Sequence, residues 1–190
     1  LFKKERRDLF ILTNPTSDSI FYDYKSGSGD LRDLAMKWAG WKTLYLRHLL
    51  IPVNLKNAHW CLLIVDLEKK LVVCWDSLVG YDRGETVKAK CAVLFSFLDD
   101  FTGDKSTWNM QVVFEGIPQQ TITDCGIFCI EFMRAFINGC KTGKELKVSQ
   151  ATMTAARKHI VREIQEKELL ENNISDVGSD KVTRRKIQNK

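Results

Sequence analysis

The sequence has few of the residues that hold metal ions in proteins. Its 190 residues include only three histidines, and none of its six cysteines belongs to a Cys-x-x-Cys pair. Structural zinc sites draw their ligands from closely spaced pairs of Cys and His. We therefore expect this chain to have no metal site.

Long hydrophobic runs are also missing, because no apolar stretch comes near the roughly 20 residues that a membrane-spanning helix needs. Most of the cysteines lie inside shorter apolar segments, as buried reduced thiols do. We therefore expect no membrane segment and a reducing compartment, either the nucleus or the cytoplasm. The printed chain begins with Leu-Phe-Lys-Lys rather than Met, and we expect it to be a fragment of a longer protein.

What is present suits one globular domain. Apolar residues make up 44% of the chain and charged residues 28%, and this length is enough to bury a core. The net charge of +5 owes much to the end of the chain, Lys-Val-Thr-Arg-Arg-Lys-Ile-Gln-Asn-Lys. Such a tail can contact nucleic acid or act as a nuclear signal, but a solvated end is commoner, so nucleic acid is not indicated. We expect one domain over residues 1–171 and a disordered polar tail over 172–190.

Hydrophobic periodicity predicts an α+β fold built on a mixed sheet. Helical spacing predicts helices over residues 31–48, 85–101 and 125–139, and from Ser149 onward. Apolar, β-rich runs predict strands over residues 49–55, 59–67, 71–78 and 110–116, with a weaker signal over 8–14. The second and third of these strands read as a hairpin, and both are almost continuously apolar. We therefore expect the sheet to be covered on both faces.

Three details of this assignment can be checked residue by residue. Pro52 places its strand at an edge, or marks a strand start. The helix from 85 should bury Val87, Cys91, Leu94, Phe95 and Leu98. The helix that Ser149 caps should carry Met153, Ala156, Ile160 and Ile164 on one apolar face.

Cys125 stands where the polar loop Ile-Pro-Gln-Gln-Thr-Ile-Thr gives way to a predicted core helix. The thiolate is the reactive form of cysteine, and a helix N-terminus or a neighbouring imidazolium lowers the pKa that controls it. Gly126 leaves room beside the sulfur for the backbone of a substrate. A buried cysteine at the head of a core helix is the commoner arrangement, so this assignment depends on partners.

A nucleophilic cysteine needs a base, and His59, at the start of a strong strand, is the best placed histidine. His159 lies on the outer helix as a surface or packing residue, and His48 has no evident role. With a turn near Lys69, position 59 falls opposite 78 or 79, so Asp76 lies within two residues of cross-strand contact with His59. A catalytic imidazole requires such an orienting group. A satisfied strand-end histidine and a turn-forming aspartate remain the plain alternatives.

An oxyanion hole needs hydrogen-bond donors beside the nucleophile. The amide of Cys125 is one candidate donor. The side chain of Gln119 or of Gln120, in the loop just before, is a candidate for the second.

In order and spacing these residues resemble the catalytic domain of the ubiquitin-like-protein-specific cysteine proteases, the SUMO-protease (Ulp/SENP) family. The matching positions are His59-Trp60, the acid Asp76 in Trp-Asp-Ser-Leu, Pro-Gln-Gln at 118–120 and Asp-Cys-Gly-Ile-Phe at 124–128. The resemblance covers roughly residues 45–140. It implies a papain-like α+β fold with the nucleophile at a helix N-terminus. It also favours Gln119 over Gln120 as the oxyanion donor, and places Trp60 in the narrow tunnel that holds the substrate's Gly-Gly segment.

The resemblance implies hydrolysis after the C-terminal Gly-Gly of a ubiquitin-like protein, most often SUMO, by a monomer without a cofactor. The family's N-terminal Trp-Leu-x-Asp motif is not found, since Trp38 and Trp41 lie in a different context, and the family's Asn-Gly before the cysteine is Thr-Ile-Thr here. Two alternatives stay open. One is an inactive module that binds ubiquitin-like proteins, and the other is a protease for a different tag.

Overall fold

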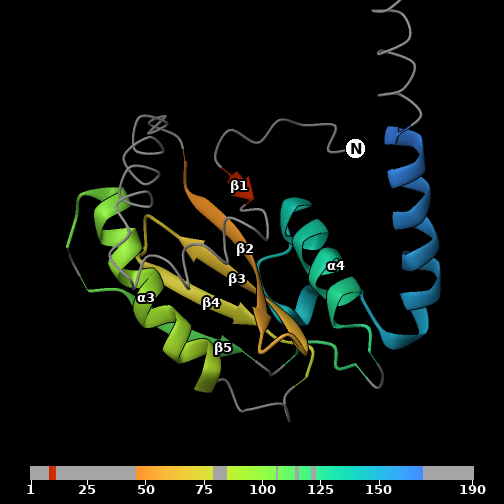
Figure 1. Cartoon of the computed structure of the whole chain (residues 1–190), viewed down its shortest axis with the longest axis horizontal. Helices are drawn as coiled ribbons and strands as arrows, with labels where there is room; N and C mark the ends of the chain where they lie inside the picture. Colours follow the sequence, from red (N-terminus) through yellow and green to blue (C-terminus); the bar gives the residue numbers. More distant parts are fainter. Residues whose placement is uncertain are drawn as a thin grey trace, which may run out of the picture.

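The computed structural model describes residues 9–11, 46–78, 85–105, 107–113, 116–120 and 123–168. These residues form a mixed sheet with helices on both of its faces (Figure 1). Residues 31–45 of the helix predicted over 31–48, which include Trp38 and Trp41, lie outside the described residues, as does the predicted tail over 172–190. None of the described helices is long and apolar enough to cross a membrane.

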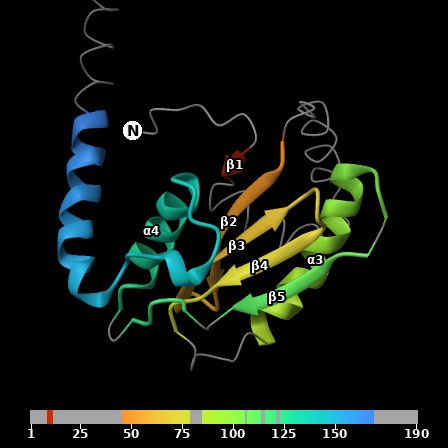
Figure 2. The ribbon, with the colours of Figure 1, turned by 180° about the vertical axis from the view of Figure 1, so that it is seen from behind.

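Five strands follow one another in the sheet in chain order. They are β1 (Leu9–Ile11), β2 (His48–Leu55), β3 (His59–Asp66), β4 (Leu71–Trp75) and β5 (Asn109–Val113). β2, β3 and β4 are antiparallel, whereas β1 runs parallel to β2 and β5 parallel to β4. The order is plainest in the view from behind (Figure 2). The predicted mixed sheet is confirmed, although Gly116, the predicted end of the last strand, lies in a turn.

β2 begins earlier than predicted. Leu46 and Arg47 are not helical, and His48 already pairs with Asp66 of β3, so the predicted helix end at 48 is wrong. Pairing across a long antiparallel ladder decides this position over the local helical spacing. The described residues of β1 pair with His48 to Leu50 of β2. β2 lies between β1 and β3 and has Pro52 in its middle, so the prediction of an edge strand or a strand start at Pro52 is wrong.

β3 and β4 form the predicted hairpin, and its register is the one that its sequence indicates. Asp66 pairs with Leu71, and Leu62 pairs with Trp75. The Asp66 carboxylate fixes the turn, because it accepts hydrogen bonds from the backbone and side-chain nitrogens of Lys69, each at 2.9 Å. Burial acts to raise the pKa of Asp66, but these hydrogen bonds outweigh it and hold the pKa below its usual value.

One face of the sheet packs against α3 (Glu85–Thr102), as Figures 1 and 2 show. The helix buries Val87, Cys91, Leu94, Phe97 and Leu98 against β2, β3 and β4. Phe97 is fully buried, whereas Phe95, which we predicted in its place, is half-buried. Phe95 lies on the flank of the buried face, where its ring stacks on Trp108 at 6.4 Å.

The other face packs against α4 (Cys125–Ile137), which is the predicted central helix. Phe128, Phe132 and Phe136 are buried on it, and the last two meet Trp75 of β4 edge-on, with ring centroids 6.0 and 6.1 Å apart. Gly139 follows the helix with φ +101°, a conformation that glycine adopts without a side-chain penalty. The predicted helix end is confirmed.

The chain then passes through two short 3-10 turns, η2 (Gly143–Glu145) and η3 (Gln150–Thr152), into the C-terminal helix, residues 153–168. Ser149 opens η3 in a capping box with Thr152, as predicted. Met153 is buried, but Ile164 is 53% exposed, so the predicted apolar face is wrong at that position. In this stretch the Arg134–Glu163 ion pair, rather than apolar packing, links the helix to α4.

Candidate active site

His59 and Asp76 form a buried pair at one end of the hairpin. Continuing the β3–β4 register three residues beyond the Leu62–Trp75 pair places Leu78 opposite His59, as predicted. The Nε2 atom of His59 lies 2.6 Å from Oδ1 of Asp76, and the two residues are 1% and 2% exposed. The same carboxylate oxygen accepts the backbone N–H of Leu78 at 2.9 Å. Since Nε2 faces the carboxylate, proton exchange between this imidazole and a nucleophile has to use Nδ1.

Cys125 is the first residue of α4 and is partly exposed. Two contacts place this end of the helix against the start of β3. The Cys129 thiol lies 3.5 Å from the backbone oxygen of Cys61, and a Cβ added to Gly126 would stand 3.8 Å from Cδ1 of Trp60. Gly126 adjoins the cysteine and Trp60 adjoins the histidine, so the fold brings Cys125 to the His59 end of β3.

Four of the other five cysteines have raised pKa values, and the fifth, Cys61, is buried. All six are free thiols. Burial raises the pKa of Cys91 to about 12 and raises that of Cys129 well above its usual value. A hydrogen bond with Cys61, together with burial, does the same for Cys74. Cys140 is partly exposed, but its pKa is raised, chiefly by burial.

The loop that carries both glutamines is attached to the rest of the site. Gln119 Nε2 donates to the backbone oxygen of Asp76 at 3.2 Å and to that of Ile117 at 3.0 Å. Gln120 donates its backbone N–H to Ser77 at 2.8 Å. Its side-chain oxygen accepts the backbone N–H of Asp124 at 3.1 Å. The loop therefore connects the segment after β4 with the start of α4, and the Gln119 amide is directed at backbone carbonyls.

Asp124, the residue before Cys125, forms a hydrogen-bonded group with Arg157 and Gln150, and the sequence analysis gave this group no role. Asp124 is 2% exposed and accepts a hydrogen bond from Arg157 Nε at 2.8 Å, as well as one from Gln150. The Arg157 hydrogen bond comes first in lowering the pKa of Asp124, against the effect of burial. A buried acid beside a candidate nucleophile calls for a cationic partner, but the burial of Asp124 emerges only from the structure.

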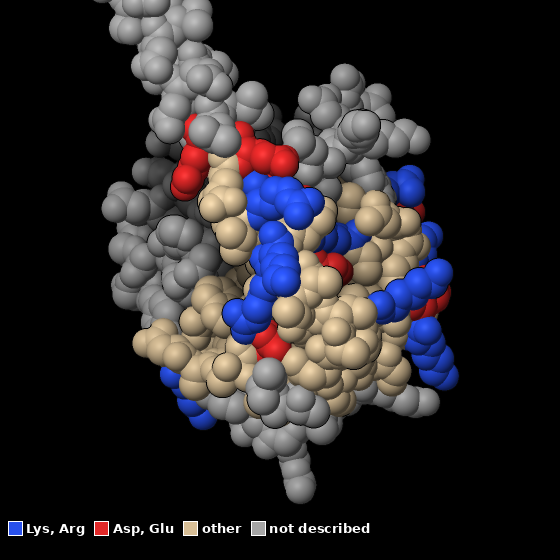
Figure 3. Space-filling model, turned by 90° about the vertical axis from the view of Figure 1, so that its right-hand side faces the viewer, with Lys and Arg blue, Asp and Glu red and all other residues tan. Residues whose placement is uncertain are grey.

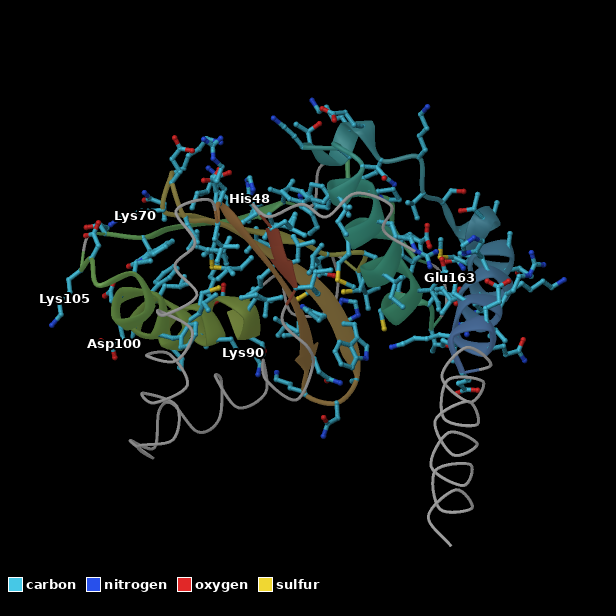
Figure 4. All side chains as sticks on the ribbon, turned by 90° about the horizontal axis from the view of Figure 1, so that it is seen from above. His48, Lys70, Lys90, Asp100, Lys105 and Glu163 are labelled. Atoms are coloured by element: carbon cyan, nitrogen blue, oxygen red, sulfur yellow. The ribbon has the colours of Figure 1, made fainter. Side chains whose placement is uncertain are left out.

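The remaining histidines lie away from this group. His48 pairs with Asp66, the last residue of the eight-residue strand β3, whereas His59 is the first residue of that strand, which puts the two histidines about 20 Å apart along the sheet. The His48 ring meets Phe136 edge-on at 5.2 Å (His48 is labelled in Figure 4). His159 is exposed on the C-terminal helix, 3.4 Å from Glu163. Both observations agree with the sequence-based interpretation.

The site has no cluster of metal ligands in the part of the chain that the structure describes: no group of three or more His, Cys, Asp or Glu is placed to hold an ion. The surface on the side of the C-terminal helix carries side chains of both charges. Figure 3 shows Lys and Arg side chains gathered in a column across that face, and Arg157, Lys158 and Arg162 belong to this helix.

Comparison with known proteins agrees with this geometry. Residues 40–171 match the profile of the "Ulp1 protease family, C-terminal catalytic domain". A sentrin-specific protease of Caenorhabditis elegans is 32% identical over 128 residues, covering 64% of this chain and 17% of that protein. The chain spans between 17% and 26% of the length of the curated relatives that it matches here.

Two solved structures show the same fold. The SUMO protease Ulp1 with its catalytic cysteine oxidized to a sulfenic acid superposes with a TM-score of 0.64 at 22% identity, over 84% of this chain and 69% of that one. The C-terminal Ulp1 protease domain in complex with Smt3, the yeast ortholog of SUMO, gives 0.59 at 21% identity, over 82% and 67%. The predicted α+β, papain-like protease fold is confirmed.

Proposed function

We propose, on the premise that this chain belongs to the Ulp1 protease family of cysteine proteases, that it hydrolyses the bond after the C-terminal Gly-Gly of a ubiquitin-like modifier, with SUMO preferred. One observation carries the proposal. The buried pair of His59 and Asp76, at 2.6 Å, lies at the end of β3 against which the Cys125 end of α4 packs.

The proposed reaction begins with a proton transfer from the Cys125 thiol to Nδ1 of His59. Asp76 keeps the proton on Nε2 and stabilises the imidazolium that forms. The N-terminus of α4, at Cys125, favours the thiolate because its backbone N–H groups carry a partial positive charge. The thiolate then attacks the carbonyl carbon of the modifier's terminal glycine.

The tetrahedral intermediate places a negative charge on the former carbonyl oxygen. The amide of Cys125 and the side chain of Gln119 are its proposed donors. Both Gln119 contacts lie to backbone oxygens, at 3.2 and 3.0 Å, so one amide hydrogen has to turn from a carbonyl to the oxyanion. Gln120 is the weaker candidate because its side-chain oxygen already binds the Asp124 amide.

Collapse of the intermediate breaks the carbon–nitrogen bond, and the imidazolium of His59 protonates the departing amine. A thioester between the modifier and Cys125 remains. Water then attacks the thioester and gives a proton to His59, and the thiol returns as the modifier leaves with a free carboxylate. Nδ1 of His59 carries the thiol proton to the amine and one water proton back to the sulfur, and the product acid releases the other water proton to solvent, so water is the only further reactant.

Trp60 gives a physical basis for glycine selectivity. Its Cδ1 atom would lie 3.8 Å from a methyl group at Gly126, so the indole stands directly over the first turn of α4. We propose that the modifier's Gly-Gly segment runs beside this contact, where only a backbone without side chains would fit. The relatives' names supply the rest of the substrate proposal, since they are sentrin-specific proteases and a structure of one family member holds Smt3.

The six free cysteines suit the proposed nuclear or cytoplasmic location, where thiols stay reduced. The substrate proposal is tested by hydrolysis of fluorogenic C-terminal amides of SUMO, of ubiquitin and of other ubiquitin-like proteins. We expect the SUMO amide to be cleaved with the highest kcat/KM. Preferred cleavage of another modifier would replace SUMO with that tag. Binding of a modifier without cleavage of any amide would instead identify an inactive binding module.

A further inference from the structure

Asp124 occupies the N-cap position of α4 but does not cap the helix. An N-cap aspartate usually accepts hydrogen bonds from the amides of the first turn. Here the side chain makes no such bond. Instead its Oδ1 accepts from both Nε and Nη2 of Arg157, and its Oδ2 accepts from Gln150. The carboxylate is therefore turned away from the helix axis, toward the C-terminal helix and the turn that precedes it.

This arrangement matters for the residue that follows. A carboxylate on the first-turn amides would take up the donors that favour an anionic sulfur at Cys125. A buried carboxylate beside that sulfur would also raise its pKa by charge repulsion, unless a cation neutralised it. Arg157 counters both effects, because its guanidinium binds the carboxylate and carries the opposite charge.

We propose that Arg157 is a positioning residue for the nucleophile, which holds Asp124 off the α4 N-terminus and neutralises its charge so that Cys125 can form a thiolate beside His59. The inference rests on the proposed role of Cys125 as the nucleophile. It adds a residue from the C-terminal helix, 33 positions beyond Asp124, to a site that the sheet and α4 otherwise build.

The charged and titratable groups around this position come from three elements. The C-terminal helix supplies Arg157, and the hairpin supplies His59 and Asp76. Cys129 lies one turn along α4 and stays a thiol, because burial raises its pKa. The hydrogen bond from Arg157, with a smaller one from Gln150, lowers the pKa of Asp124. Asp124 is therefore an anion throughout the range in which a cysteine protease works.

Arg157 also helps to attach the C-terminal helix, so a control must separate the two roles. Arg134, on α4, forms an ion pair with Glu163 of the C-terminal helix (Glu163 is labelled in Figure 4). Arg134 belongs to the last turn of α4, whereas Asp124 stands before the first. Replacing Arg134 therefore loosens the same pair of helices without touching the carboxylate beside the nucleophile.

The test measures the pKa of the Cys125 thiol from the pH dependence of iodoacetamide alkylation, with the Cys125 peptide followed by mass spectrometry. In the full chain, Arg157→Met should raise that pKa by about one unit, and so slow alkylation about tenfold at pH values below it. Arg157→Lys should retain most of the wild-type value. Asp124→Asn, which leaves Arg157 unbalanced, should lower the pKa. Arg134→Met should leave it unchanged.

An unchanged thiol pKa in Arg157→Met, or an equal rise in Arg134→Met, would overturn the inference. Should Arg157→Met fail to fold, Asp124→Asn decides the matter on its own, since a thiol pKa that does not fall contradicts the charge argument. Alkylation by iodoacetamide requires no ubiquitin-like protein, so this test does not depend on the identity of the substrate. Wild-type chain that alkylates as expected but cleaves no SUMO amide would disprove the proposed substrate while leaving the role of Arg157 intact.

Discussion

The Nε2 atom of His59 lies 2.6 Å from Oδ1 of Asp76, in a place where neither residue meets solvent. That contact decides which ring nitrogen is left to exchange protons with Cys125. It also arises from two nearby stretches of sequence, since the residues are 17 positions apart on either side of one hairpin turn. The acid–base part of the site is therefore a product of hairpin register.

Replacing Asp76 by asparagine should retain the fold but lower kcat by about 10³- to 10⁴-fold, because an amide no longer fixes the imidazole tautomer or stabilises the imidazolium. Hydrolysis of a SUMO C-terminal fluorogenic amide measures the loss. Asp66→Asn is the matched control, since that carboxylate lies at the other end of the same hairpin and binds Lys69. A similar loss in both variants would mean that hairpin stability, rather than the His59 contact, sets the rate.

Replacing Gln119 by alanine should lower kcat by about 10²- to 10³-fold with little change in KM, as expected when a donor to the oxyanion is removed. Gln120→Ala should lower it less than tenfold and reduce the free energy of unfolding by about 1 kcal/mol, because it loses the hydrogen bond to the Asp124 amide. Steady-state kinetics and denaturant unfolding on both variants give the comparison. The reverse order of effects would transfer the oxyanion role to Gln120.

Replacing Gly126 by alanine should separate stability from activity. The added methyl group would meet Trp60 at 3.8 Å, an ordinary contact, and alanine favours a helix over glycine by up to about 1 kcal/mol. We therefore expect unfolding at the same or a higher temperature. The methyl group fills part of the passage proposed for the modifier's Gly-Gly, so kcat/KM should fall at least tenfold. Unimpaired cleavage would show that the substrate takes another path.

The Asp124–Arg157 pair should make stability depend on acid pH. The folded-state pKa of Asp124 lies below its ordinary value of 3.8, so its contribution is complete above the unfolded pKa and is lost as the pH falls through the folded value. Arg157→Met raises the folded pKa toward the unfolded value, so the variant should be less stable than wild type at neutral pH and should lose less of its stability as the pH falls. Urea unfolding between pH 3 and 7 tests this, and superimposable pH profiles would contradict it.

Sequence reasoning succeeded where the interaction is local. The turn at Lys69 and the period of two along a strand were enough to place Leu78 opposite His59 and to bring Asp76 within reach. The head of α4 was predicted for a similar reason, since a change from polar loop to apolar helix is visible at Cys125. These features depend on residues within one element or one hairpin.

Long-range contacts account for what was missed. The antiparallel ladder between β2 and β3, not helical spacing, fixes His48 as the start of a strand. The face of α3 that meets the sheet takes in Phe97 and leaves Phe95 on its flank, against Trp108. Arg157 reaches Asp124 only because the C-terminal helix returns to α4. The sequence indicates neither the burial of Asp124 nor the residue that neutralises it.

The most direct test of the central claim uses SUMO with a thiol-reactive group at its C-terminus. The wild-type chain should form a covalent adduct on Cys125, identified by mass spectrometry of the cross-linked peptide. Cys125→Ala should form none, and His59→Ala should form it at least 100-fold more slowly, in keeping with the loss of a general base. An adduct on another cysteine, or an equal rate in folded His59→Ala, would contradict the account.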